Sequence, residues 1–387
     1  MAMTPLDKPT YARYLPAMGL VALACLIAYA AMAEWLPTEA RSHVILGAAI
    51  LPLILANMLY FSATLTRSSQ PTPVVWGWPL LGLLAGVVVI AALSYDRRWA
   101  VLGAVMGMVA VVGTFAWIQK RRKNCLGDPH PGLRWYEGAL VSLMLGLVAI
   151  TVGLFMPDYW VPLRSIHLHL NLMGFVGLTA VSTMQVLLPT AAGYADTDAV
   201  RRLHKHWPWA LVGTVALALG AAGFRIFYLI GLGAWLVPLV AWLRSLWSFR
   251  DKIFDGGGAT WPLLAAVIGF VIMMFSGLFI ALGWMSPENT LPLFFIGFLF
   301  PLITGALTHL LPLWWWPGLE TPLRSEARSA IELGSPGRAA LFVICGLGAI
   351  KGYAWVAPLA AAGIAQFLLQ LVMVKLKTAK MPPGNTF

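Results

Sequence analysis

Charged residues are scarce in this chain. Asp, Glu, Lys and Arg together make up only 11% of its 387 residues, whereas 60% are hydrophobic. The mean hydropathy is +0.80. A soluble domain of this size has too little interior to bury so much apolar surface. The composition therefore excludes a soluble protein and predicts an all-α, polytopic integral membrane protein in contact with the lipid bilayer.

Cysteine is also rare. The three cysteines are Cys25, Cys125 and Cys345, and no two of them form a CxxC pair. Two lie in apolar runs and one lies in a charged loop. This distribution argues against both a disulfide framework and a zinc site built from cysteines.

Carboxylates are missing from the middle of every apolar run. Glu34 and Glu288 lie at or beyond the predicted outer ends of such runs. Proton pumps and proton-coupled transporters usually carry Asp or Glu inside the membrane, so the sequence argues against these classes. The main polar residues in the middle of the runs are Asn57 and Gln185.

The apolar runs predict about twelve membrane spans. The first run follows Lys8 and Arg13, as in a signal peptide, but it lacks a clear small-residue cleavage site, so we read it as a retained helix. The predicted spans are 14–36, 42–65, 74–95, 98–118, 136–156, 165–189, 207–223, 225–247, 260–284, 290–313, 337–355 and 357–376. They leave no loop long enough for a separate domain, so we expect one transmembrane domain over 1–387.

The basic residues predict the orientation of these spans. With the N-terminus inside, only six of the 26 Lys and Arg residues fall in outer segments: Arg41, Arg97, Arg98, Arg164, Arg225 and Lys351. Cytoplasmic loops carry the excess of basic residues in membrane proteins. Both termini are therefore predicted to be cytoplasmic. The net charge of +11 then reflects membrane topology and does not indicate nucleic-acid binding.

A short internal repeat links spans six and ten. GFVGLTAVSTMQVLLP, which starts at Gly174, aligns with GFLFPLITGALTHLLP, which starts at Gly297. Span two has a similar opening, with His43 followed by Gly47. Because spans two, six and ten are four apart, the twelve helices are predicted to form three groups of four about a pseudo-threefold axis.

Three histidines lie near the predicted outer ends of spans two and six: His43, His167 and His169. Ionisable residues inside a membrane tend to mark a functional site. Residues two apart on a helix point about 200° away from each other. His167 and His169 should therefore face different neighbours, and only one of them can share a ligand with His43.

The polar residues of span six suggest which one. On a regular α-helix, Asn171, Ser182 and Gln185 fall on the His167 side, whereas Thr183 falls on the His169 side. The His167 side is thus the more polar one, which suits a polar cavity better than contact with the edge of a haem. If a haem is bound here, we therefore favour His169 as the residue that shares it with His43.

Imidazole is a common ligand for haem iron, copper and zinc, and two histidines from facing helices can hold a haem. Outer cations such as Arg41 and Arg164 are suited to pair with haem propionates. The alternative is that the three histidines are neutral, hydrogen-bonded residues of the membrane interface. Of the other four, His309 is read as a bundle residue, His130 as part of a turn, and His204 and His206 as part of a solvated basic face.

The twelve spans, the histidine that opens span two and the HxH motif of HLHLNLMGFVGLTAVSTMQVLLPT, which starts at His167, resemble the haem–copper oxidase subunit I superfamily. Within that superfamily the chain looks closer to short, ligand-poor relatives, which include NnrS-like haem and copper membrane proteins and the membrane parts fused to some bacterial copper oxidases. The resemblance implies haem b, with or without copper, bound by His43, His167 and His169 near the periplasmic face of a bacterial inner membrane. It also implies a redox partner protein.

The ligand set is smaller than that of the respiratory enzymes. Thr290 and Pro292 occupy the span-ten positions that the repeat aligns with His167 and His169, and span seven contains no internal histidine. We therefore expect electron transfer, a response to nitric oxide or another diatomic gas, or metal handling, and not full oxygen reduction. Whether the protein is an enzyme stays open. The alternatives are a transporter or copper-handling protein that uses the outer histidines transiently, and a cofactor-free assembly subunit.

Overall fold

The structure is a computed structural model that describes residues 9–32 and 35–379. Within these ranges the chain is almost entirely helical and contains no β-strand. The two chain termini, predicted to be cytoplasmic, and residues 33–34 of the first predicted span lie outside the described residues.

Ten helices in the described part of the chain are long and apolar enough to cross a membrane. The two remaining predicted spans correspond to α9 (Ala199–Ala221), whose first turns are basic, and to α12 (Thr260–Met274), which has only 15 residues. The all-α polytopic membrane fold is thus confirmed, while the count of twelve spans stays a prediction. The prediction of one continuous helix over 260–284 is wrong, because α12 ends before Phe275 and a short α13 (Ser276–Ala281) follows. Ser276 and Gly277 are weaker helix formers than the aliphatic residues before them.

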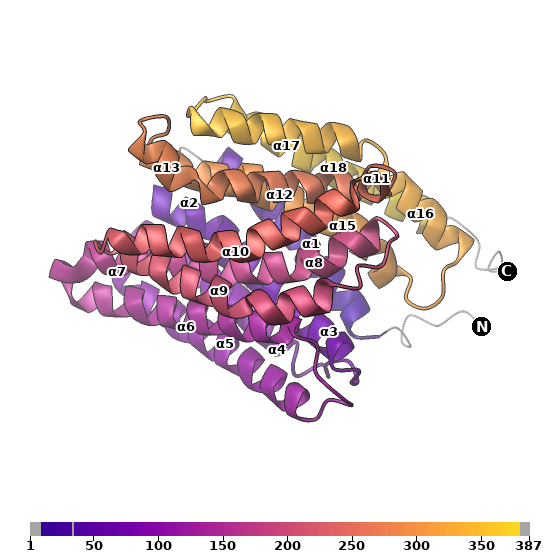
Figure 1. Ribbon diagram of the computed structural model, residues 1–387, viewed down its shortest axis with the longest axis horizontal. Helices are drawn as coiled ribbons and strands as arrows, with labels where there is room; N and C mark the ends of the chain where they lie inside the picture. Colours follow the sequence, from indigo (N-terminus) through magenta and orange to yellow (C-terminus); the bar gives the residue numbers. More distant parts are fainter. Residues whose placement is uncertain (1–8, 33–34, 380–387) are drawn as a thin grey trace. The chain divides into compact units, whose positions relative to one another are not determined.

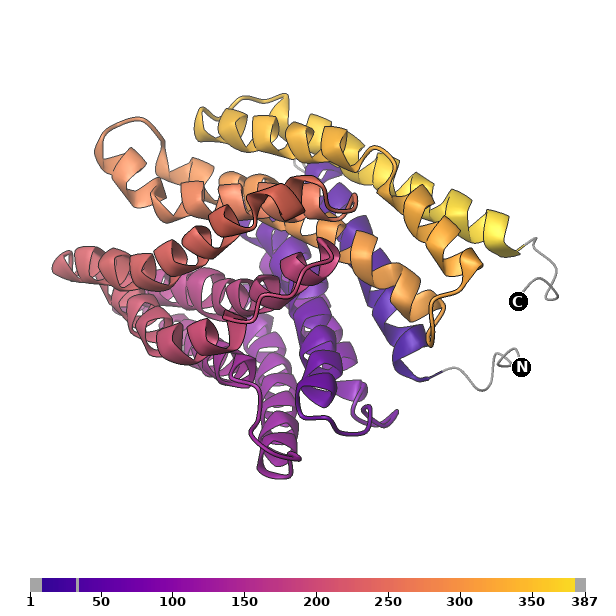
Figure 2. The ribbon, with the colours of Figure 1, turned by 45° about the vertical axis from the view of Figure 1, so that its right-hand side comes forward.

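Residue contacts divide the chain into two compact units. Unit 1 contains residues 1–45, 190–194 and 251–387. Its helices and short helical segments are α1 (Tyr11–Ala31), α2 (Thr38–Ile45), α12, α13, η5 (Pro287–Asn289), α14 (Thr290–Pro292), η6 (Leu293–Leu299), α15 (Phe300–Trp315), α16 (Pro322–Glu332), α17 (Ser335–Ile350) and α18 (Val356–Ala379), with α11 (Arg250–Phe254) starting at the boundary. Helix α1 packs against α15 and α18, and α17 runs beside α18 (Figures 1 and 2).

Unit 2 contains residues 46–189 and 195–250. Its elements are η1 (Leu46–Ile50), α3 (Leu51–Leu65), α4 (Gly77–Tyr95), η2 (Arg97–Trp99), α5 (Ala100–Lys123), α6 (Gly132–Phe155), η3 (Pro157–Tyr159), α7 (Trp160–His169), η4 (Leu170–Leu178), α8 (Thr179–Ala191, with its last two residues in unit 1), α9 and α10 (Ile226–Ser248). Neighbours in sequence pack as hairpins, most extensively α4 with α5 and α9 with α10.

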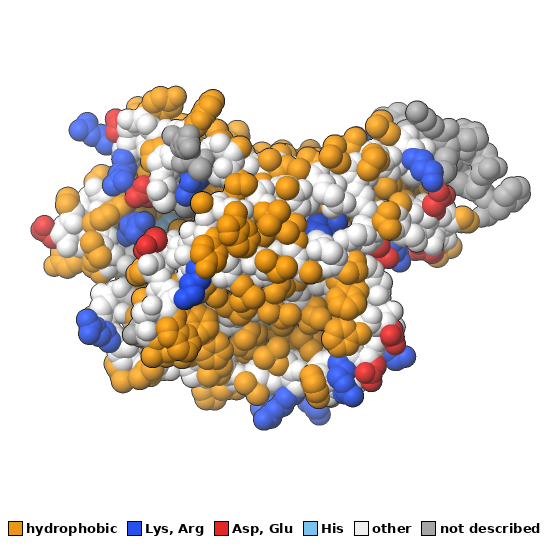
Figure 3. Space-filling view, turned by 90° about the horizontal axis from the view of Figure 1, so that it is seen from above, with side chains coloured by type: hydrophobic (Ala, Val, Ile, Leu, Met, Phe, Trp, Pro, Cys, Tyr) orange, Lys and Arg blue, Asp and Glu red, His pale blue; other side chains and the backbone are white. Residues whose placement is uncertain are grey.

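Large apolar side chains are exposed along the helices, as expected for a surface in contact with lipid. Leu84 of α4 is 55% exposed and Val105 of α5 is 53% exposed. Hydrophobic side chains cover broad areas of the face in Figure 3. The bilayer removes the cost that this surface would have in water.

Among the described residues, three of the membrane helices contain a π-helical segment, and these are the helices that the sequence repeat links. The segments are η1, η4 and η6, and they begin three residues after His43, His167 and Thr290, respectively. In the repeat alignment the first residue of η4 corresponds to the first residue of η6. The spans were predicted as regular α-helices, and that expectation is wrong in these segments. Because π-helices are rare and usually short, three at corresponding positions support the repeat.

Local chemistry explains why the α-helix is interrupted there. Pro52 follows η1 and Pro301 follows η6, each near the start of the next α-helix. A proline ring removes one backbone donor and clashes with the carbonyl four residues earlier, and both of those carbonyls lie in the π-segment. In η4 the Thr179 hydroxyl instead donates to the Phe175 carbonyl at 2.6 Å. Such a bond to residue i−4 also distorts helices.

Small residues on neighbouring helices allow the π-segments to pack closely. A Cβ on Gly86 of α4 would overlap the backbone of Gly47 in η1, and a Cβ on Gly269 of α12 would overlap the carbonyl of Gly297 in η6. Close backbone approach through small residues is a common way to associate helices in membranes.

The three π-containing helices are also the most buried candidate spans. In the most apolar 18-residue window of each span, buried residues make up 61% in Thr38–Leu65, 89% in Pro157–Ala191 and 72% in Pro287–Trp315. In the other seven spans found among the described residues the share is 28–44%. The arrangement of all twelve helices about one axis stays a prediction.

Candidate metal-binding histidines and a basic pocket

His167 and His169 occupy the last turn of α7, directly before η4, and face different helices as predicted. The His167 ring faces α6, where its Nδ1 lies 2.9 Å from the Gly146 carbonyl oxygen. The His169 ring meets the Tyr228 ring of α10 edge to face, with 6.2 Å between centroids. Two residues apart on a helix, the side chains point about 200° away from each other, and this produces the separation.

Asn171 lies on the His167 side, also as predicted. Its amide nitrogen donates to the His167 carbonyl at 2.6 Å and lies 3.1 Å from Nδ1 and 3.5 Å from Nε2 of the His167 ring. The amide therefore covers one edge of the His167 imidazole. It has no such contact with His169 in the part of the chain that the structure describes.

The α-helical face assignment is less accurate beyond η4. Ser182 faces α6 near Gly132, like His167, whereas Gln185 accepts a bond from Arg202 at 2.6 Å. Thr183 was assigned to the His169 side, but its hydroxyl bonds to Tyr136 of α6 at 3.0 Å. Each residue of a π-helix turns through a smaller angle than a residue of an α-helix, so angles counted across η4 are shifted.

His43 and His169 share the same local hydrogen bond. Nδ1 of His43 lies 2.8 Å from the Glu39 carbonyl, and Nδ1 of His169 lies 3.0 Å from the Ser165 carbonyl, each four residues earlier on the same helix. A carbonyl oxygen only accepts, so each Nδ1 must carry the ring proton and each Nε2 is unprotonated. This tautomer, fixed by a bond to a backbone carbonyl, is the one expected of metal-ligating histidines. The donor chemistry therefore fits an axial ligand of haem iron.

The two predicted propionate partners are arranged differently. The Arg41 guanidinium lies 5.2 Å from the centroid of the Tyr29 ring in unit 1. Arg164 is exposed on α7 in unit 2, one turn before His167. Both cations thus lie within three residues of a predicted ligand in sequence, and their pairing with a propionate stays a prediction.

Across the described residues, no group of three or more His, Cys, Asp or Glu side chains is arranged to hold a metal ion. His43 belongs to unit 1, whereas His167 and His169 belong to unit 2. The pairing of His43 with either of them stays a prediction.

The assignment of His130 to a turn is confirmed. His130 precedes α6 and its Nδ1 accepts from the Gly132 amide at 3.1 Å. Burial lowers the pKa of its imidazole, so the ring is neutral at pH 7. His130 therefore serves a structural role at the start of α6.

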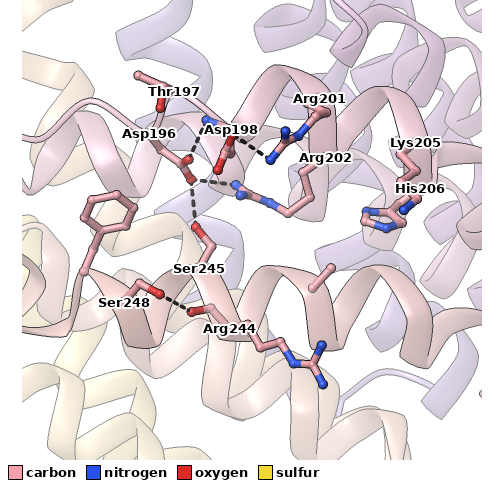
Figure 4. Close-up of a pocket in the computed structure, with 12 residues that line it drawn as sticks. Asp196, Thr197, Asp198, Arg201, Arg202, Lys205, His206, Arg244, Ser245 and Ser248 are labelled. Atoms are coloured by element: carbon pink, nitrogen blue, oxygen red, sulfur yellow. Dashed lines mark hydrogen bonds and ion pairs between the residues drawn. The ribbon is translucent and has the colours of Figure 1, made fainter.

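A basic pocket between α9 and α10 was not anticipated from the sequence. It encloses about 610 Å³ and lies wholly within unit 2 (Figure 4). Its lining residues are Asp196, Thr197, Asp198, Arg201, Arg202, Lys205, His206, Ala241, Arg244, Ser245, Ser248 and Phe249. The signal in the sequence was the set of basic residues before span seven, which we read only as a solvated face.

Arg202 contradicts that interpretation, because it is only 8% exposed. Its Nη2 donates to Asp196 at 2.7 Å and its Nε donates to Gln185 at 2.6 Å. The Asp196 carboxylate also accepts from the Ser245 hydroxyl at 3.0 Å. A buried charge needs such partners, so this network joins α8, α9 and α10 at one end of unit 2.

The helices and their lipid-facing surface define a polytopic all-α membrane protein. No protein-family model matches the chain, and no curated protein sequence is significantly similar to it.

Proposed function

We propose that this chain is a haem-binding protein of a bacterial inner membrane, related in architecture to haem–copper oxidase subunit I and its NnrS-like members. The ligands that we propose are His43 and His169. Nδ1 of all three rings bonds to a backbone carbonyl, which leaves each Nε2 unprotonated. The observation that favours His169 over His167 is the Asn171 amide, which lies 3.5 Å from Nε2 of His167, the nitrogen that a metal would bind.

The role of His167 differs in this proposal. Its ring bonds to the backbone of α6, and the Asn171 amide covers one edge of it. His167 is therefore a positioning residue that fixes α7 against α6 beside the ligand, or the ligand of a second metal such as copper.

The π-segments support a functional role for the two helices that carry the proposed ligands, His43 and His169. Such segments occur often at functional sites, and η1 and η4 each begin three residues after a histidine. A b-type haem held by two histidines supplies reversible one-electron chemistry. The roles we propose are electron transfer with a redox partner protein, a response to nitric oxide or another diatomic gas, or metal handling.

The test is a visible absorption spectrum of the full chain purified in detergent, together with its metal content. The proposal expects a Soret band, sharp α and β bands after reduction, and about one iron per chain. Copper without haem would favour a transporter or copper-handling protein. If protein expressed with added haem precursor contains neither iron nor copper, the result would favour an assembly subunit.

A further inference from the structure

The basic pocket between α9 and α10 contains more positive charge than its own carboxylates neutralise. Asp196 pairs with Arg202 at 2.7 Å, and Asp198 pairs with Arg201 at 3.0 Å. Among the described residues no carboxylate lies within ion-pair distance of the two remaining cations, Lys205 and Arg244. The pocket thus carries an excess of two positive charges.

These two cations lie on different walls of the pocket. Lys205 extends from α9 and Arg244 extends from α10 (Figure 4). Burial and the Lys205 charge lower the pKa of His206, so this imidazole is neutral at pH 7 and adds hydrogen-bonding capacity without charge. A phosphate group, with several acceptor oxygens and negative charge, suits a pocket with this excess of positive charge on its two walls.

Both walls continue into exposed apolar side chains. Residues three or four apart share one face of a helix, so Lys205 is followed on its face by Trp209 and Val212, and Arg244 is preceded on its face by Val237. These side chains are 50, 55 and 38% exposed, respectively. A soluble phosphate does not use such a surface, whereas the acyl chains of a lipid do.

The predicted topology places this end of α9 and α10 on the cytoplasmic side. Basic pockets between membrane helices on that side are suited to anionic lipid headgroups. We propose that the pocket binds an anionic phospholipid, with Lys205 and Arg244 contacting the headgroup phosphate and the acyl chains lying along Trp209, Val212 and Val237. The Asp196–Arg202 pair acts as a positioning element that holds the two walls in place.

Native mass spectrometry of the detergent-purified full chain tests this proposal, with phosphatidylglycerol and phosphatidylcholine of identical acyl chains as probes. Wild-type protein is expected to retain phosphatidylglycerol preferentially. The double variant K205Q/R244Q should lower its affinity for phosphatidylglycerol by at least about tenfold, because each cation near a lipid headgroup contributes about 1 kcal/mol. R244K, which keeps the charge, should lose less.

The matched control is K120Q/K123Q, which removes two exposed lysines from α5, on the same predicted membrane side but outside the pocket. It should bind phosphatidylglycerol like wild type, and the melting temperatures of all variants should agree. Equal loss in both double variants would show a non-specific charge effect and overturn the proposal, as would equal retention of the two lipids.

Glycerol 3-phosphate separates the two sources of phosphate, because it carries the charged group without acyl chains. The proposal expects it to bind at least about tenfold more weakly than phosphatidylglycerol, since burial of apolar carbon adds to affinity. Binding as tight as that of the lipid, abolished by K205Q/R244Q, would assign the pocket to a soluble phosphate compound and overturn the lipid assignment.

Discussion

The chemistry of single residues separates three histidines that look alike in sequence. His43 and His169 each bond to a carbonyl of their own helix, whereas His167 bonds to the backbone of α6. An imidazole whose second nitrogen is fixed in this way keeps one tautomer and one orientation. All three rings therefore keep one tautomer, and it is the Asn171 amide, 3.5 Å from Nε2 of His167, that gives His167 a different expected response to substitution.

We predict that His43→Ala and His169→Ala abolish or shift the haem spectrum. His167→Ala should keep the same haem bands and should either weaken the packing of α7 against α6 or remove a second metal. Spectra and metal content of the three variants, measured side by side, check this. Wild-type haem stoichiometry and bands in all three would rule out the ligand assignment.

The buried Asp196–Arg202 pair gives a second prediction at the residue scale. Asp196→Ala leaves the Arg202 charge in a site where it is 8% exposed, which should cost about 3 kcal/mol and lower the apparent melting temperature. The control is Asp198→Ala, which breaks an exposed pair with Arg201 and should cost less than about 1 kcal/mol. Equal melting temperatures for the two variants would contradict the role assigned to the buried network.

At the scale of elements, the three π-segments distinguish η1, η4 and η6 from the rest of the bundle. Prolines or a threonine hydroxyl interrupt the α-helix, and small residues across the contact let the widened backbone approach a neighbour. The π-segments therefore depend on small residues of the neighbouring helices as well as on their own sequence.

Gly269→Leu tests that dependence. Even a Cβ on Gly269 would overlap the Gly297 carbonyl, so we expect a loss of stability of about 3 kcal/mol or failure to accumulate in the membrane. Gly277→Leu is the matched control, because in the described part of the chain no atom beyond the neighbouring residues and the helix's own backbone lies within 4 Å of a Cβ at that position. Expression and thermal stability of the two variants decide the matter. If Gly269→Leu is as stable as Gly277→Leu, close packing on η6 is not required.

At the scale of the whole molecule, the orientation in the membrane rests on the distribution of Lys and Arg. A reporter active only in the periplasm should be active when fused after Pro287, since the Glu288 loop is predicted to be outside, and inactive when fused after Gly334. The opposite pattern would remove the argument that the three histidines share the outer side.

The whole chain should also fail to reduce oxygen at respiratory rates. Thr290 and Pro292 replace the ligands expected on span ten, and no carboxylate lies in the middle of a predicted span to carry protons. Oxygen consumption by purified protein with an artificial electron donor measures this. Cyanide-sensitive uptake at respiratory rates would show that other residues supply the missing ligands.

The sequence by itself determined the membrane class, the positions of most helices and the divergence of His167 and His169. These features follow from hydrophobicity and helical periodicity, which act over a few neighbouring residues. The short breaks predicted between spans seven and eight and between spans eleven and twelve are present, because α9 ends at Ala221 before α10 begins at Ile226, and α17 ends at Ile350 before α18 begins at Val356.

Only the tertiary structure decided the π-segments, the side-chain faces beyond η4 and the pocket between α9 and α10. The pocket and the close packing of the π-segments depend on contacts between different helices, such as Arg202 with Gln185 and Gly269 with Gly297, in addition to the local prolines and threonine that interrupt the α-helix. Arg202 and Lys205 look equivalent in a run of basic residues. One is buried against Asp196 and the other is exposed at the pocket, because Asp196 and Ser245 arrive from a loop and another helix.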